Sequence, residues 1–326
     1  MHFCFGDCGV RMIAIQRGGT LIVHTRRVED MLEADSEREH RWRSKAMNLG
    51  AACIVVALKA HLRDRFIRGV VGMGVAMINF AGLGKSYGSV DAVRNLTFSV
   101  GRGEVFGFLG PNGAGKTTTI RMLMGILVPS AGHITVDGLD CQADRVAVKR
   151  RVGYLPDSPL FYDFLRGREI LEFVGEMHGQ SRGVANRNAE RLLGEFGLDE
   201  ASEEYAVNYS MGMKKKLGLA CALIHDPQVL VLDEPTNGLD PRAAREVQNR
   251  LHACAEAGKT IFLSTHLLDM AERLCSRLGI IHQGELVGLG ALAELQANVE
   301  AGGSLEEVFL KLTESADEPA PLQAAV

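Results

Sequence analysis

The chain contains the stretch Gly110-Pro111-Asn112-Gly113-Ala114-Gly115-Lys116-Thr117, and the rest of the sequence is organised around it. The stretch matches the phosphate-binding pattern G-x-x-x-x-G-K-[ST] at every fixed position. Residues 104–109 before it form an apolar run typical of a short buried strand, and residues 118–127 after it carry apolar side chains at helical spacing. The motif therefore lies between a strand and a helix, which is the setting that its mechanism requires.

This loop predicts a site for a nucleoside triphosphate. Glycines allow the backbone to turn its N–H groups toward a phosphate chain, and the positive end of the following helix adds attraction. We expect Lys116 to reach the β- and γ-phosphates, and Thr117 to offer its hydroxyl to Mg²⁺. The alternative is a glycine-rich turn that matches by chance. The predicted nucleotide-binding residues of the loop are Gly110, Pro111, Asn112, Gly113, Ala114, Gly115, Lys116, Thr117 and Thr118.

The composition fits a globular protein of about one to three domains. The 326 residues are 46% hydrophobic and 23% charged, and the net charge of −4 gives no reason to expect a nucleic-acid partner. No stretch is long and apolar enough to span a membrane. The seven cysteines have no paired spacing, which indicates free thiols in a reducing compartment, with a metal site at Cys4 and Cys8 as the alternative.

Regular strand and helix periods begin at Met77 and predict an α/β domain. We expect strands at residues 77–80, 93–100, 104–109, 133–136, 151–155, 229–232 and 260–264, a turn at 82–88, and a hairpin at 278–289. Helices are expected at residues 167–177, 184–196, 210–224, 241–257, 291–299 and 304–312. The first three of these helices follow one another without a strand between them, so residues 158–225 are predicted to be an inserted helical subdomain.

Several polar residues stand at positions suited to a nucleotide site. Asp233 and Glu234 close a buried strand, where Asp233 could hold magnesium and Glu234 could orient or deprotonate an attacking water. His266 follows the next strand and is a candidate contact of the γ-phosphate, although lone histidines are more often structural. Tyr87 could stack on a purine or be an ordinary surface tyrosine. The acids could likewise close a plain surface turn.

Ser210 and Gly212 stand at the start of a predicted helix, where an anion could dock. An ordinary N-cap followed by a solvated lysine face is the alternative interpretation of this segment.

Together, and in this order, these motifs closely resemble the ATP-binding subunit of an ABC transporter over about residues 77–313. The resemblance implies a P-loop NTPase core of the ABC ATPase type, with an antiparallel β subdomain and the helical subdomain. It implies ATP and Mg²⁺ as ligands and an adenine contact for Tyr87. It makes 110–117 the Walker A loop, 229–233 the Walker B strand, Glu234 the catalytic carboxylate, 238–240 the D-loop and His266 the switch histidine.

By the same resemblance, Ser210 and Gly212 belong to the signature that caps the γ-phosphate held by the opposite subunit of a dimer. The usual Leu-Ser-Gly-Gly-Gln is altered here, since the chain has Tyr209, Met211 and Met213, as divergent exporter-type members do. Asp157 stands where the family usually has a glutamine that touches magnesium and the membrane partner. An acid there could approach magnesium, although its side chain is shorter.

The resemblance predicts an ATPase subunit that forms a homodimer or heterodimer and energises a separately encoded membrane permease, which would hold it at the cytoplasmic face of the membrane. A soluble ABC-type ATPase that acts on a non-transport partner is the alternative, although such proteins resemble tandem ATPase domains or carry long coiled coils. A regulatory module that only binds nucleotide is a third possibility, but Glu234 is intact.

The two ends of the chain are predicted to lie outside this domain. Residues 1–76 supply none of the motifs, favour Arg over Lys and show no sustained period, so we expect a poorly structured extension and Met77 as an alternative start. A regulatory or docking extension is the rival, because residues 41–45 could approach anionic lipid or a permease loop. Residues 314–326 are predicted to be a disordered tail.

Overall fold

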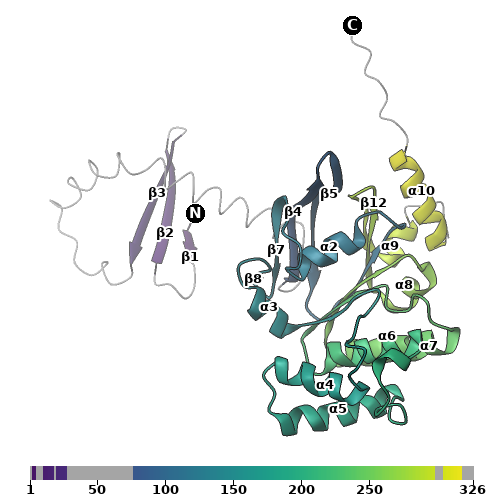
Figure 1. Ribbon diagram of the computed structural model, residues 1–326. Coiled ribbons are helices and arrows are strands. Elements are labelled where there is room, and N and C mark those ends of the chain that lie inside the picture. The colour runs from purple at the N-terminus through teal and green to yellow at the C-terminus, as the bar shows by residue number, and fades with distance from the viewer. Residues whose placement is uncertain (1, 5–9, 18–19, 28–75, 298–303, 318–326) are drawn as a thin grey trace. The chain divides into compact units, whose positions relative to one another are not determined.

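The structure is a computed structural model that describes residues 2–4, 10–17, 20–27, 76–297 and 304–317 (Figure 1). The chain divides into two compact units, Met1–Gly72 and Met73–Val326. The predicted interaction of residues 41–45 and the Cys8 alternative lie outside the described residues.

The first unit contains a three-stranded antiparallel sheet in the order β1-β2-β3, made of β1 (His2–Cys4), β2 (Val10–Arg17) and β3 (Thr20–Arg27). The structure therefore differs from the expected poorly structured extension over these strands. A signal for the hairpin is present in the sequence, because Gly18-Gly19 separates two runs rich in β-branched and other apolar residues, and such a pair favours a two-residue hairpin turn.

The second unit is built on a six-stranded sheet in the order β13-β12-β6-β11-β10-β9. Its strands are β6 (Val105–Leu109), β9 (Val152–Leu155), β10 (Val229–Asp233), β11 (Thr260–Thr265), β12 (Arg277–His282) and β13 (Glu285–Ala291). All neighbours pair in parallel except β12 and β13, which form an antiparallel hairpin. The predicted core strands and this hairpin are confirmed.

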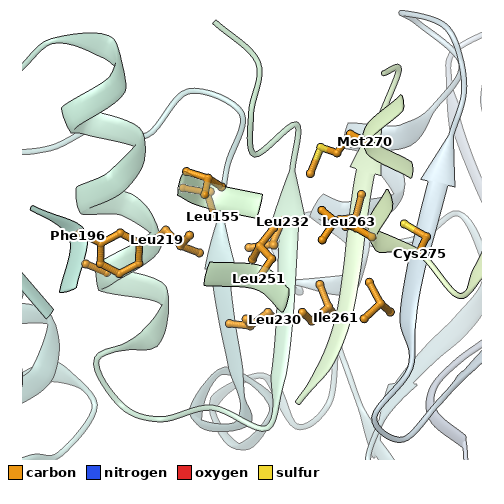
Figure 2. Packing of buried hydrophobic residues seen from close by; sticks show 14 of the residues in the cluster. Leu155, Phe196, Leu219, Leu230, Leu232, Leu251, Ile261, Leu263, Met270 and Cys275 are labelled. Atoms are coloured by element: carbon orange, nitrogen blue, oxygen red, sulfur yellow. The ribbon is translucent and has the colours of Figure 1, made fainter. Parts of the chain in front are cut away.

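The central strands are buried on both faces, which explains why their sequences are continuous apolar runs. In β10, Leu230 and Leu232 face the core beneath the helices, which Figure 2 shows, whereas Val229 and Val231 face a second core. Because side chains alternate along a strand, one run serves two cores. In the second core the ring of Phe262 stacks on that of Phe106, with centroids 5.7 Å apart.

An antiparallel sheet in the order β5-β4-β7-β8 covers this second core. It consists of β4 (Ala76–Tyr87), β5 (Val90–Gly101), β7 (Ala131–Val136) and β8 (Leu139–Asp140). The turn predicted at residues 82–88 is wrong, because β4 continues through Gly82, whose φ is +59°. The pairing with β5 and β7 shifts register around this residue, so the glycine forms a bulge inside a longer strand.

The helices include the inserted block predicted from the sequence. They are α2 (Lys116–Leu123), α3 (Arg145–Arg151), α4 (Gly167–Met177), α5 (Arg182–Phe196), α6 (Met211–Leu223), α7 (Pro241–Glu256), α8 (Leu268–Leu274), α9 (Leu292–Ala297) and α10 (Leu305–Asp317), with a 3-10 turn η2 (Ala206–Asn208). In Figure 1, α4 and α5 lie at the opposite end of the unit from β4 and β5.

Two predicted helix ends need correction. Helix α2 ends at Leu123, before Leu127, because Gly125 adopts a φ of +63°. Helix α10 runs to Asp317, so the predicted disordered tail is helical over its first residues, and residues 318–326 lie outside the described part of the chain.

Candidate nucleotide-binding and catalytic site

Three neighbouring strands, β6, β11 and β10, end at the same edge of the parallel sheet. Thr265 pairs with Leu109 and Ser264 pairs with Asp233, so the phosphate loop, the two acids and His266 follow strand ends that lie side by side. A cavity of about 380 Å³ opens there. Its lining residues are Ala92, Pro111, Asn112, Gly113, Gly115, Lys116, Thr117, Thr118, Asp157, Glu234, Asn237 and His266.

The glycines of the phosphate loop are required by both backbone conformation and close packing. Gly115 caps α2 with a φ of +107°, and a Cβ atom there would lie 2.6 Å from the carbonyl oxygen of Ala92. A Cβ atom at Gly110 would lie 2.3 Å from the carbonyl oxygen of Ile281. Because contacts this short are not tolerated, only glycine lets the loop take this shape.

Lys116 places a buried ammonium group in the cavity. Its side chain is 6% exposed, and its Nζ donates hydrogen bonds to the carbonyl oxygens of Gly110 at 2.6 Å and Pro111 at 3.2 Å. The same Nζ lies 3.4 Å from Oε1 of Glu234. A cation held in this way at a helix N-terminus is suited to bind phosphate oxygens.

Asp233 is a buried carboxylate at the end of β10. It accepts a hydrogen bond from the hydroxyl of Ser264 at 2.5 Å. Burial raises the pKa of Asp233, and hydrogen bonds from Ser264 and Thr117 oppose that rise. The contact with Thr117 brings together two of the three residues that the sequence predicts as magnesium ligands, the third being Asp157.

Glu234 occupies a strained turn directly after Asp233. Its φ is +47°, which is uncommon for a residue with a Cβ atom. Its Oε2 lies 3.0 Å from Nδ1 of His266. Its Oε1 is buried and accepts no hydrogen bond among the described residues, and Lys116 approaches it only at ion-pair distance. A carboxylate oxygen that faces the phosphate loop in this way is suited to accept a proton from water.

Asp157 is tied to other residues at the rim of the cavity. Its Oδ1 accepts a hydrogen bond from Nδ2 of Asn237 at 3.2 Å and lies 3.6 Å from Nζ of Lys215. Lys215 is 1% exposed and donates to the carbonyl oxygen of Glu234 at 2.6 Å. Burial lowers the pKa of Lys215, while the charge of Asp157 opposes that change.

The sequence motifs did not predict Ser264, Asn237 and Lys215 as parts of the site. For Lys215 a signal existed, because Leu219 and Ala222 lie four and seven residues later and mark a buried helix face. The sequence contains no such signal for Ser264 or Asn237, since polar residues are common at strand ends and in turns.

The residues that line the cavity do not include Tyr87, Ser210 or Gly212. Tyr87 ends β4, is 51% exposed, and has Nζ of Lys85 at 5.2 Å from its ring centre. Ser210 caps α6, and its hydroxyl accepts the backbone N–H of Met213 at 3.2 Å. Gly212 follows in the first turn of α6. Their predicted roles stay predictions.

Comparison with known proteins identifies relatives along most of the second unit. Residues 93–237 match the ABC transporter family. The linearmycin resistance ATP-binding protein of Bacillus subtilis (strain 168) is 36% identical over 219 residues, which cover 67% of this chain and 70% of that protein. Nod factor export ATP-binding protein I of Paraburkholderia xenovorans (strain LB400) is 41% identical over 237 residues, which cover 73% of this chain and 78% of that protein.

A solved structure described as an ATP-binding subunit of an ABC transporter has a TM-score of 0.68 and 32% identity, and the match covers 73% of this chain and 99% of that one. In the part of the chain that the structure describes, no helix has the length and apolar character needed to cross a membrane. The motifs, the fold and the relatives agree, and the chain belongs to the family of ATP-binding subunits of ABC transporters and is an ATPase.

Proposed function

We propose that this ATPase energises a separately encoded membrane permease that exports its substrate. The observation that carries the chemistry is the position of Glu234, whose two carboxylate oxygens contact His266 and Lys116 beside the phosphate loop. The observation that supports export is the set of relatives, since those described above are named for resistance and for export.

In the proposed reaction, a water molecule attacks the γ-phosphorus of ATP and the bond to ADP breaks. Lys116 and the loop N–H groups bind the phosphate oxygens, where they stabilise the charge that develops. Glu234 accepts the proton of the water, and His266 keeps the carboxylate of Glu234 oriented. Tyr87 is proposed to contact the adenine, as the sequence predicts.

The donor set fits Mg²⁺. Thr117 offers a hydroxyl next to the carboxylate of Asp233, and Asp233 is buried, so a cation there would offset the cost of burying its charge. Among the described residues, no group of three His, Cys, Asp or Glu side chains could hold a metal. Mg²⁺ commonly binds to one or two carboxylates together with substrate phosphates, and Asp233 and the phosphate loop would supply this combination. When bound, it would screen the phosphate charge.

We further propose a dimer in which Ser210 and Gly212 of one subunit complete the site of the other. This fits the start of α6, where Ser210 and Met211 are exposed and Gly212 is partly exposed, and none of them lines the cavity of its own chain. The test is Glu234→Gln, which keeps size and removes the basic oxygen. We expect ATP binding to persist, hydrolysis to fall about 100-fold or more, and an ATP-dependent dimer to accumulate in size-exclusion chromatography. A monomer under all conditions would contradict the dimer.

Contact with the permease, which would hold the chain at the cytoplasmic face of the membrane, is proposed at the loop after β9. Leu160, Tyr162 and Phe164 are 93%, 69% and 87% exposed there, and they follow Asp157 within a few residues. Three large apolar side chains exposed within one short loop are typical of an interaction site. We expect Leu160→Ser with Phe164→Ser to abolish permease-stimulated hydrolysis and keep basal hydrolysis, unlike the control Val146→Ser on α3. Wild-type stimulation would refute this surface.

For the chain as a whole, we propose that residues 77–313 form the ATPase domain, with residues 158–225 as its helical subdomain. The region matched by the family lies inside these limits. Full hydrolysis by a chain that begins at Met77 would support them.

A further inference from the structure

A closed ring of polar contacts lies just behind the catalytic carboxylate. The ammonium of Lys215 donates to the carbonyl oxygen of Glu234 at 2.6 Å, and the backbone N–H of Asn237 donates to the same oxygen at 3.2 Å. The side-chain amide of Asn237 donates to Oδ1 of Asp157 at 3.2 Å, and the same Oδ1 lies 3.6 Å from Nζ of Lys215, which closes the ring. The ring joins α6, the turn after β10 and the loop after β9.

The ring acts on the strained point of the site. Glu234 has a left-handed backbone, a conformation that a residue with a Cβ atom adopts only when its surroundings impose it. On one side, the N–H of Glu234 donates to the carbonyl oxygen of Ser264 at 3.1 Å. On the other side, its carbonyl oxygen is held by the ring. The backbone from which the Glu234 side chain projects is therefore held on both sides.

Lys215 differs from its neighbours in the run Lys214-Lys215-Lys216. Lys215 is 1% exposed, and its charge lies among Asp157, Asp233 and Glu234, which all interact with it electrostatically. Lys216 instead points to α7, where it pairs with Glu246 at 2.6 Å. A buried ammonium is stable only where fixed acceptors compensate for the loss of water. The carbonyl oxygen of Glu234 and the carboxylate of Asp157 provide these acceptors for Lys215 and not for Lys216.

We propose that Lys215 is a positioning residue for hydrolysis, which holds the left-handed turn of Glu234 and links it rigidly to α6 and to Asp157. The inference rests on the proposed role of Glu234 as the base. Since Ser210 caps α6, the same contact would pass a movement of that helix on to the carboxylate. In this role Asp157 is the counter-ion of Lys215, and it need not bind the metal.

The test compares Lys215→Met, Lys215→Arg and the control Lys216→Met in the full chain. For each, kcat and KM of Mg-ATP hydrolysis, ATP affinity and Tm are measured. We expect Lys215→Met to lower kcat about tenfold or more with KM and affinity within about threefold, because a misdirected base impairs the chemical step. Lys215→Arg should recover most of kcat, and Lys216→Met should match the wild type.

A wild-type kcat in Lys215→Met would overturn the inference. A parallel loss of kcat, ATP affinity and Tm in this variant would overturn it too. If Lys215→Met does not fold, Asp157→Asn decides. The ring predicts a lower kcat at saturating Mg²⁺ with an unchanged Mg²⁺ requirement, whereas an increased Mg²⁺ requirement would show that Asp157 acts at the metal. Glu234→Gln separates the two proposals: if it retains hydrolysis, the role of Glu234 fails independently of Lys215.

Discussion

Replacement of Ser264 by alanine tests the electrostatics of the site most directly. The hydroxyl of Ser264 is buried, donates to Asp233 at 2.5 Å and accepts the N–H of Glu234 at 3.2 Å. That N–H retains the carbonyl oxygen of Ser264 at 3.1 Å as an acceptor. Ser264→Ala therefore removes a hydrogen-bond donor from the carboxylate of Asp233, which stays buried.

Hydrogen bonds to charged groups contribute roughly 1.5–3 kcal/mol, so Ser264→Ala should lower the free energy of unfolding by about 2 kcal/mol at neutral pH. In a unit of this size the corresponding fall in Tm is about 4–8 °C. Urea denaturation and calorimetry without nucleotide would measure both. At saturating Mg-ATP the deficit should shrink, because a metal at Asp233 replaces the lost donor.

The control is Ser276→Ala, which removes a hydroxyl that donates to the neutral carbonyl of Val105 at 3.1 Å. We expect a loss of only about 1 kcal/mol there. The bond from Ser264 favours the charged form of Asp233, so the Ser264→Ala deficit is largest above the raised pKa of Asp233 and declines as pH falls through it. A deficit equal to that of Ser276→Ala, or independent of pH, would refute this reasoning.

Three further predictions concern the loop, the sheet and a histidine pair. Lys116→Ala should weaken ATP binding roughly 10- to 100-fold in a fluorescent-nucleotide titration, with Lys214→Ala unchanged. Gly153→Ala should lower the free energy of unfolding, measured by urea denaturation, by about 2–3 kcal/mol, because a Cβ atom there would lie 2.1 Å from the carbonyl oxygen of Ala222. A Cβ atom at Gly183 would lie 3.7 Å from Nη1 of Arg187, so Gly183→Ala should instead raise the free energy of unfolding. The rings of His178 and His225 stack with centroids 3.6 Å apart, and burial lowers the pKa of His225 from 6.5 to about 4. His225 therefore binds a proton more readily in the unfolded chain than in the folded one, so Tm should fall as pH drops from 6.5 toward 4. If Tm of the His225→Gln variant falls with pH as steeply as that of the wild type, this prediction is contradicted.

Local patterns were sufficient wherever one segment carries its own signal. The apolar runs of β10 and β11 and the helical spacing of α4 predicted these elements closely, because burial of whole strands and helix faces constrains every residue in them. The pattern failed at Gly82, where pairing on both sides of β4 carries the strand through a glycine that resembles a turn signal.

The sequence by itself determined the chemistry of this protein: a phosphate loop, two acids at a strand end and a histidine after the next strand, all identifiable from residue type and spacing. Tertiary structure alone decided which groups meet. Ser264 and Lys215 reach Asp233 and Glu234 from separate elements, through contacts that span 31 and 19 positions in the chain. Asn237 lies in the same turn as Glu234 and reaches across 80 positions to Asp157. Such contacts depend on sheet register and on how α6 packs against β9, and no local period in the sequence encodes them.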